Sequence, residues 1–269
     1  MPGEGRSEQL TEEQVRAKAR TLWDEVMAWA ESLKQPWRPD PSSPLAADDK
    51  LVQHMFVSYL ARVSLAIGTE HMLTTLAYAL NFRPNMFSMQ TLLRTALIGG
   101  AQTLWLLSPS DQTTRVDRAN RLSVDAYVYQ QGWAHELKDL GGIGGVNPVE
   151  LATLMANLTE LTGGKTRPEV KVTSVIQDAA NHLYPGPTEA TARAECLAEW
   201  RHLSSAVHAL PWNLNIRAEK ESRQFEGEPA TLYLSSWTQL QGAISHSYNF
   251  LRTGWKMLET QGAALDSET

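Results

Sequence analysis

The stretch TLLRTALIGGAQTLWLL, residues 91–107, decides the fold, because it would be apolar on nearly all sides of a helix. It belongs to a predicted helix of about Met86 to Leu107, and a helix of this kind is expected at the centre of a bundle. The run Gly99-Gly100-Ala101 would let a neighbouring helix approach closely. Arg94 is the exception within the stretch. A buried guanidinium needs partners, so we expect Arg94 to face a polar pocket.

Helix signals extend from this stretch towards both ends of the chain. Thr11-Glu12-Glu13-Gln14 has the pattern of a capping box and predicts a helix from there to about Lys34. Four prolines between Gln35 and Pro44 predict a loop. A long helix is predicted from about Ala46 to Arg83, either continuous or broken at Gly68. Further helices are predicted at about Gln112–Leu140, Asn147–Leu161, Val172–His182, Thr188–Ala209 and Ser235–Glu259.

Together these signals predict an all-α protein: a single multi-helix bundle of about seven to eight helices. Strand character occurs only between Asn213 and Tyr233, so we expect at most a small β-hairpin near residues 213–234. Residues 1–10 are interpreted as a mobile tail and residues 11–269 as one helical domain. Arg115, Arg118 and Arg121 lie three apart along one side of the predicted helix Gln112–Leu140.

Composition limits the classes of partner and compartment. A formal net charge of −6 and a pI of about 5.7 argue against broad electrostatic binding to nucleic acid or to an anionic membrane. The single cysteine, Cys196, allows no internal disulfide and favours a reducing, cytoplasmic setting. We expect Cys196 to be a small core or surface residue rather than a reactive one. Residues 1–13 lack the pattern of a signal peptide, and residues 91–107 are too short to span a bilayer, so no membrane association is expected.

Common catalytic and cofactor motifs are missing from the sequence. The seven histidines show no HExxH motif, there is no cysteine pair, and no GxSxG nucleophile elbow occurs. The glycine-rich run Gly141–Val146 is not followed by Lys-Ser/Thr and is not preceded by a predicted strand, which argues against a phosphate-binding loop. We therefore expect neither a metal site nor a bound cofactor.

The candidate chemistry lies in WRHLSSAVH, residues 200–208. Arg201 and His208 are seven residues apart, so on a helix they differ by roughly 20° in azimuth and about 10.5 Å along the axis. Ser204 falls between them, and Ser205 lies at the edge of the same face. A neighbouring apolar stripe is the expected core contact of this helix; it consists of Trp200, Leu203, Val207 and Leu210.

These residue types suit cleavage of a phosphodiester without a metal ion. A guanidinium stays charged and forks onto phosphate oxygens, and an imidazole can take or give a proton near neutral pH. An alternative stays open, in which Arg201 pairs with Glu195 or Glu199 and His208 caps the helix C-terminus, where a cation is favoured.

On a late predicted helix, Arg201 is followed directly by His202 and, with six residues between Arg201 and it, by His208. This order resembles the signature of HEPN domains. The earlier segment RTALIG, residues 94–99, is similar to an Arg-containing helix of HEPN-like bacterial proteins, and the resemblance covers about residues 85–209. It implies a metal-independent ribonuclease that works as a dimer, in toxin–antitoxin or phage-defence systems. It further implies that Arg201 stabilises the scissile phosphate, that His208 is the acid–base, and that the supporting residues are His202, Ser204, Ser205 and Arg94.

Two hypotheses therefore follow from the sequence. The first is a ribonuclease whose partners are RNA, a second copy of the chain and an antitoxin-like protein. The small residues Ala194 and Ala198 on the face of Arg201 would permit close approach of a second copy. The second is a non-enzymatic binding or regulatory protein, in which the Arg/His motif is structural. Exposure separates them, because an open Arg201–His208 pair favours the first and a pair locked against glutamates in a closed core favours the second.

Overall fold

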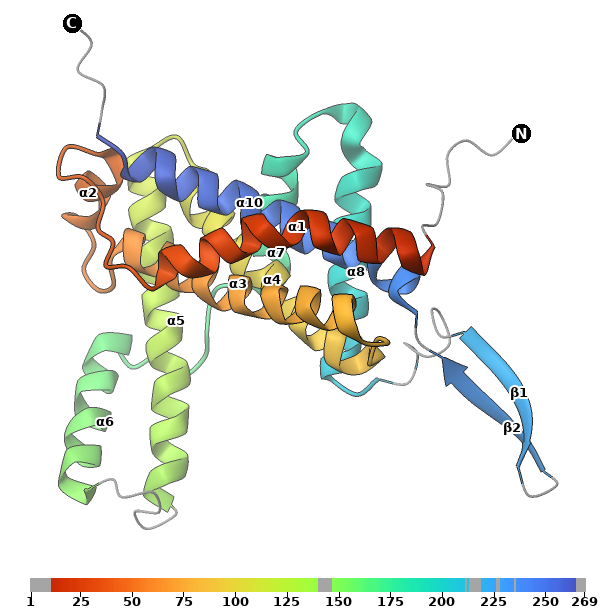
Figure 1. The fold of residues 1–269 in the computed structure, drawn as a ribbon. Coiled ribbons are helices and arrows are strands. Elements are labelled where there is room, and N and C mark those ends of the chain that lie inside the picture. The colour runs from red at the N-terminus through yellow and green to blue at the C-terminus, as the bar shows by residue number, and fades with distance from the viewer. Residues whose placement is uncertain are drawn as a thin grey trace, which may run out of the picture.

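The computed structural model describes residues 11–139, 147–210, 212, 219–225, 228–234 and 236–264 (Figure 1). Within them the chain forms nine α-helices and one antiparallel hairpin, so the predicted all-α bundle is confirmed. The predicted tail at residues 1–10, the glycine run 141–146 and the predicted strand 213–217 lie outside the described residues. The elements are α1 (Glu12–Leu33), α2 (Pro44–Asp49), α3 (Val57–Asn81), α4 (Met86–Leu107), α5 (Gln112–Asp139), α6 (Pro148–Thr162), α7 (Val172–Leu183), α8 (Ala190–Val207), β1 (Glu219–Phe225), β2 (Glu228–Leu234) and α10 (Gln241–Gly262).

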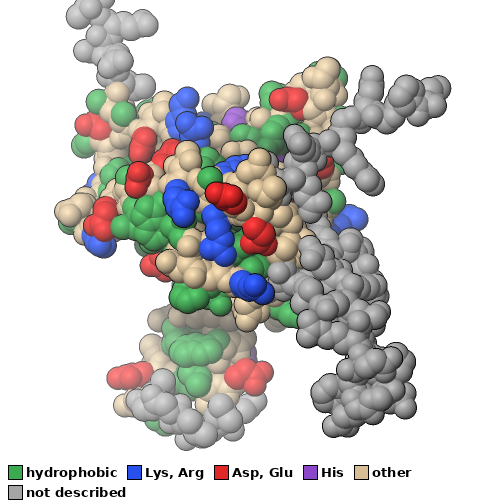
Figure 2. Space-filling model, turned by 45° about the vertical axis from the view of Figure 1, so that its right-hand side comes forward, with side chains coloured by type: hydrophobic (Ala, Val, Ile, Leu, Met, Phe, Trp, Pro, Cys, Tyr) green, Lys and Arg blue, Asp and Glu red, His purple; other side chains and the backbone are tan. Residues whose placement is uncertain are grey.

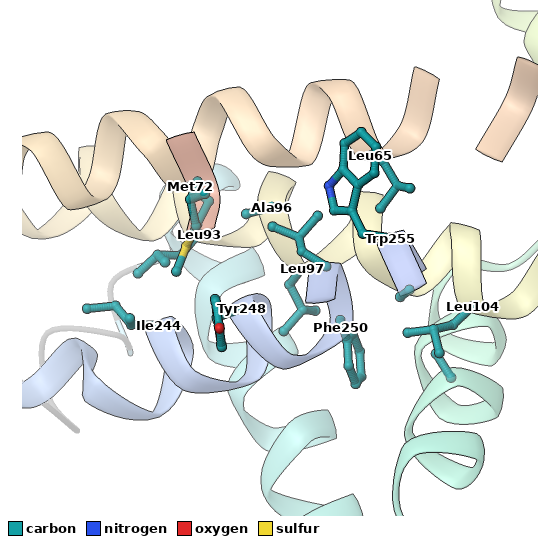
Figure 3. Close-up of a cluster of buried hydrophobic side chains, with 14 of the residues drawn as sticks. Leu65, Met72, Leu93, Ala96, Leu97, Leu104, Ile244, Tyr248, Phe250 and Trp255 are labelled. Carbon is teal, nitrogen blue, oxygen red and sulfur yellow. The ribbon is translucent and has the colours of Figure 1, made fainter. Parts of the chain in front are cut away.

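Helix α4 lies at the centre of the bundle, as its apolar sequence predicts. It packs against α3, α10, α7 and α8. Leu93, Leu97 and Leu104 are fully buried, and Figure 3 shows them in one cluster with Met72 of α3 and Phe250 of α10. Burial of a leucine side chain stabilises a fold by about 1.5–3 kcal/mol, so this helix supplies much of the core.

The predicted helix from Ala46 to Arg83 is wrong in its first third. The chain forms the short helix α2, then a turn, and only at Val57 begins α3. Asp49 explains the restart, because its carboxylate accepts the backbone N–H of Ser58 at 3.0 Å and the Ser58 hydroxyl at 2.5 Å. An acceptor from the end of one helix thus satisfies the first turn of the next.

Gly68 does not break α3, so of the two forms that the sequence leaves open the helix is continuous there. The helix continues through it, and Gly68 instead allows contact with α4. A Cβ atom on Gly99 of α4 would lie 2.4 Å from the Ser64 carbonyl oxygen and 3.0 Å from the Gly68 Cα atom. On its other side α4 meets α10, where a Cβ atom on Gly100 would lie 2.6 Å from the Leu251 nitrogen. The glycines therefore mark two close helix crossings.

Two buried or half-buried arginines join elements that are distant in sequence. Arg115 of α5 makes a bidentate ion pair with Asp48 of α2, with Nε–Oδ2 at 2.6 Å and Nη2–Oδ1 at 2.9 Å. Arg16 of α1 donates to the last carbonyls of α3, at 2.9 Å to Ala79 and 2.9 Å to Phe82. These carbonyl and carboxylate oxygens lose their water partners on burial, and the N–H groups of each guanidinium replace them as hydrogen-bond donors.

The outer half of α5 and the whole of α6 form an arm that extends away from the bundle (Figure 1). A small apolar cluster of its own, with Ala134, Leu151 and Leu158 buried, holds the two helices together. The Asn147 side chain accepts the Val149 N–H at 2.9 Å and begins α6, as predicted from Asn147-Pro148. In the described part of the chain, no helix is both long and apolar enough to cross a membrane.

Candidate functional site on helix α8

Helix α8 carries the Arg/His motif and is anchored at both ends. It follows a 3₁₀ turn at Pro187–Glu189, and Arg193 in its first turn donates to the Tyr184 and Gly186 carbonyls at 2.5 and 2.7 Å. Along its length α8 packs against α4 and α7, and more lightly against α10. The motif therefore sits on a helix that packs directly against the central helix α4, rather than on a loop.

The buried side of α8 differs from the predicted apolar stripe. Leu203 is fully buried as predicted, but Val207 is 41% exposed and Leu210 is 44% exposed. Trp200 is half-buried. The interior side instead includes polar residues; the buried residues are Cys196, Glu199, His202, Leu203 and Ser205.

Arg201 and His208 both lie on the exposed side of α8, and Ser204 between them is half-buried. The Nε atom of Arg94 on α4 donates to the Ser204 hydroxyl at 3.1 Å. Ser204 is three residues after Arg201 and four before His208, which makes it the surface neighbour of both on a helix. The contact therefore brings a second guanidinium, from a segment 110 residues away, to the face that carries the motif.

The electrostatic setting of this face is cationic. Among the described residues, no carboxylate lies within 4 Å of the guanidinium of Arg94 or of Arg201. The alternative prediction of an Arg201 pair with Glu195 or Glu199 is therefore not met; Glu199 is buried, and its carboxylate faces Gly242 at the start of α10. Partial burial lowers the pKa of Arg94, since the charged form loses hydration, yet an arginine remains charged at neutral pH.

His202 and Ser205 lie in the interior and not on the exposed face. His202 is 4% exposed, and its ring lies 6.1 Å from the Trp212 ring, centroid to centroid. Ser205 donates its hydroxyl to the His202 carbonyl at 2.6 Å. Their expected support of the motif can only be indirect, through the setting of the helix.

The C-terminus of α8 ends in a Schellman motif at which His208 is the C-cap. The Leu210 N–H bonds the Ser205 carbonyl at 2.9 Å, and the Ala209 N–H bonds the Ala206 carbonyl at 3.1 Å. Ala209 adopts φ of +52°, a conformation that usually belongs to glycine. His208 thus lies beside the last carbonyls of the helix.

A buried thiol–imidazole contact lies on the opposite side of α8. The Cys196 Sγ and the His246 Nδ1 of α10 are 3.0 Å apart. Burial, reinforced by the negative charges of Glu195 and Glu199, raises the pKa of Cys196 to about 12. The thiol is therefore protonated and enclosed, as expected from its sequence context. The sequence gives no signal for His246, which lies 50 residues further along the chain.

Among the described residues, no group of three His, Cys, Asp or Glu side chains is arranged to hold a metal ion. The face defined by Arg94, Arg201, Ser204 and His208 is called the motif face below. No family model matches the chain, and neither the curated proteins nor the solved structures yield a match, so the function has to be argued from this geometry.

Proposed function

We propose that the protein is a HEPN-like, metal-independent ribonuclease that acts at the motif face. The observation that carries the proposal is the contact of Arg94 with Ser204, because it gathers two guanidinium groups and an imidazole on one exposed surface. A cationic, open face suits a phosphodiester, whose charge is matched by arginine forks. A purely structural Arg201 would instead be expected to pair with a carboxylate.

In the proposed reaction the 2′-hydroxyl of the substrate RNA attacks the adjacent phosphorus. A new bond forms between the 2′-oxygen and phosphorus, the bond from phosphorus to the 5′-oxygen breaks, and the product carries a 2′,3′-cyclic phosphate. His208 takes the proton of the 2′-hydroxyl, and the leaving 5′-oxygen receives a proton from water or from a second imidazole. Arg201 and Arg94 stabilise the charge that develops on the phosphate oxygens.

The proposal includes a homodimer. Ala194 and Ala198, which are small and exposed, lie on the same side of α8 as Arg201. A two-fold contact along this side would place two motif faces opposite each other and give each 5′-oxygen a proton donor from the second copy. An antitoxin-like partner that covers this surface would block the reaction, consistent with a role in toxin–antitoxin or phage-defence systems.

The test is incubation of the purified protein with mixed RNA in EDTA, followed by analysis of product ends. We expect cleavage to 2′,3′-cyclic phosphates and resistance of DNA. His208→Ala should lower the rate by about 10²–10⁴-fold. The matched control is His135→Ala, which removes an exposed histidine of α5 outside the motif face. Cleavage that needs magnesium, or that His208→Ala leaves intact, would overturn the proposal.

A second candidate is a non-enzymatic binding or regulatory protein with a structural motif. The observation that favours it is the position of His208 as the C-cap of α8, together with the burial of His202 and Ser205. Arg201→Lys separates the two. A ribonuclease should lose activity, because an ammonium lacks the planar fork, while a structural module should keep its stability and its binding.

A further inference from the structure

A pocket of about 330 Å³ lies at the other end of α4, away from the motif face. The end of α4, the first half of α5, and the first half of α7 with the segment that leads into it line this pocket. Its volume is at the lower end of the range of about 300–1,000 Å³ that small-molecule ligands occupy. The residues that line it are Trp105, Arg118, Arg121, Glu169, Val170, Lys171, Ser174, Val175 and Asp178.

The walls of this pocket are held in place by specific bonds. Buried Asp125 of α5 accepts the backbone N–H groups of Glu169 and Val170, both at 2.8 Å, and thereby fixes the segment before α7. Arg118 donates to the Trp105 carbonyl at 2.5 Å and stacks over the Trp105 ring, with its Cζ atom 4.7 Å from the centroid. The pocket is therefore pre-formed, which reduces the entropy lost on binding a ligand.

Of the charged side chains that line the pocket, Arg121 is only weakly paired and Lys171 has no ion pair among the described residues. Asp178 lies 3.5 Å from Arg118, and Glu169 lies 3.0 Å from Lys165. Arg121 has only an exposed contact with Asp117 at 3.8 Å, a kind of ion pair that contributes little. For Lys171 no ion pair occurs within the described residues. Arg121 and Lys171 thus remain available to an anion.

The first turn of α7 adds to the positive potential of the pocket. Lys171 is the N-cap residue, and no side chain caps this helix end in the described part of the chain. The backbone N–H groups of Ser174 and Val175 both bond the Lys171 carbonyl, at 2.9 and 3.1 Å. The earlier N–H groups of the turn and the helix dipole favour an anion at this position. The Ser174 hydroxyl lines the same wall and can donate.

We propose that this pocket binds the phosphate of a phosphate monoester of about the size of a mononucleotide, seated between Arg121 and Lys171. A phosphate monoester carries a charge of about −1.5 to −2 at pH 7, which matches two cations and a helix N-terminus. The remaining volume, beside Val170 and Val175, accommodates the less polar part of the ligand. The same chemistry occurs in a free nucleotide and in the 5′-phosphate of an RNA chain.

This inference does not depend on the proposed ribonuclease activity. Trp105 and Arg94 are 11 residues apart on α4, which corresponds to about 16 Å along the helix. Neither Arg201 nor His208 lines the pocket. Binding at the pocket can therefore be measured in the absence of cleavage, and a His208→Ala protein should bind the phosphate ligand as well as the unmodified protein.

The test is isothermal titration of the full-length protein with 5′-AMP, adenosine and inorganic phosphate at low salt. We expect 5′-AMP to bind at least tenfold more tightly than adenosine, and to be displaced by inorganic phosphate. Arg121→Gln and Lys171→Gln should each weaken 5′-AMP binding by tenfold or more. Both residues are exposed, so circular dichroism should show an unchanged fold. Lys138→Gln is the matched control, because it removes one exposed positive charge from the outer end of the same helix α5.

A second arm distinguishes the source of the phosphate. A short RNA with a 5′-phosphate is compared with the same RNA carrying a 5′-hydroxyl, in the His208→Ala background to prevent cleavage. Tighter binding of the phosphorylated RNA than of 5′-AMP assigns the pocket to an RNA end, and equal binding assigns it to a free nucleotide. Equal affinity for 5′-AMP and adenosine, or unchanged 5′-AMP affinity in both glutamine variants, would overturn the proposal.

Discussion

The crossing of α3 and α4 gives the sharpest test of the fold, through the substitution Gly99→Ala. A Cβ atom on Gly99 would lie 2.4 Å from the Ser64 carbonyl oxygen, 3.0 Å from the Gly68 Cα and 3.1 Å from the Gly68 nitrogen. All three atoms belong to the backbone of α3, so no side-chain rotation can relieve the contact. The optimal distance between carbon atoms is about 3.5–4.0 Å, so the two helices would have to separate by roughly 1 Å.

Two opposing contributions decide how much Gly99→Ala changes the free energy of unfolding. Replacing glycine by alanine inside a helix gains about 1 kcal/mol in helix propensity. Overpacking of a close-packed core typically costs about 1–3 kcal/mol, and more where backbone has to move, and it would also loosen the neighbouring contacts of Leu97. We therefore expect Gly99→Ala to lower the free energy of unfolding by about 2 kcal/mol or more, which for a chain of this size corresponds to a fall in Tm of about 4–8 °C.

Gly132→Ala is the matched control, since it makes the same change in helix α5 where no atom lies within 4 Å of the added Cβ. It should gain the full propensity term of about 0.8–1.0 kcal/mol. Urea unfolding followed by circular dichroism at 222 nm measures the first variant, and hydrogen exchange of α5 amides adds a local measurement for the second. We expect Gly99→Ala to lower the free energy of unfolding and Gly132→Ala to raise it. If Gly99→Ala proves as stable as the unmodified protein, the close α3–α4 crossing is wrong.

Three further predictions concern stability and reactivity. Asp48→Ala should cost about 3–5 kcal/mol in urea unfolding, because Arg115 would keep a buried charge without its partner. Ala209→Gly should stabilise the protein by about 1 kcal/mol, because the residue sits at φ +52°; no gain in Tm would argue against the Schellman motif. Cys196 should resist thiol reagents at pH 8 in the native state and react after denaturation. Burial raises the pKa of Cys196 from 9.0 to about 12. The stability gained by keeping the buried thiol neutral is therefore complete below about pH 9 and should be lost between pH 9 and 12. Unfolding experiments at alkaline pH measure this loss.

Surface charge is mixed on the face of the molecule that Figure 2 presents. Figure 2 shows basic and acidic side chains close together on the face that it presents, with hydrophobic side chains between them. A face of this kind creates no extended field of one sign, so nucleic acid would have to be recognised on it at defined groups of cations. The motif face and the pocket at Arg121 and Lys171 are two such groups, and their variants should act independently.

The sequence alone predicted the helices and most of their ends, because those signals are local. The capping box at Thr11, the Asn147-Pro148 start of α6 and the apolar run of α4 each act within a few residues, and the structure contains all three. The exposed side shared by Arg201 and His208 also follows from helical periodicity. The break between α2 and α3 was missed, since it depends on Asp49 reaching Ser58 nine residues away.

Only the tertiary structure decided which side of α8 is buried and what meets it. Val207 and Leu210 are as apolar as Leu203, yet they remain exposed, because the packing of α8 against α4 and α7 selects a side that includes His202 and Glu199. The contact of Arg94 with Ser204 joins residues 110 positions apart, and in the pocket between α4, α5 and α7 Arg118 meets Asp178, 60 positions further along the chain. Helix propensity acts over three or four residues and carries no information about such pairs, which are fixed by the close packing of whole helices.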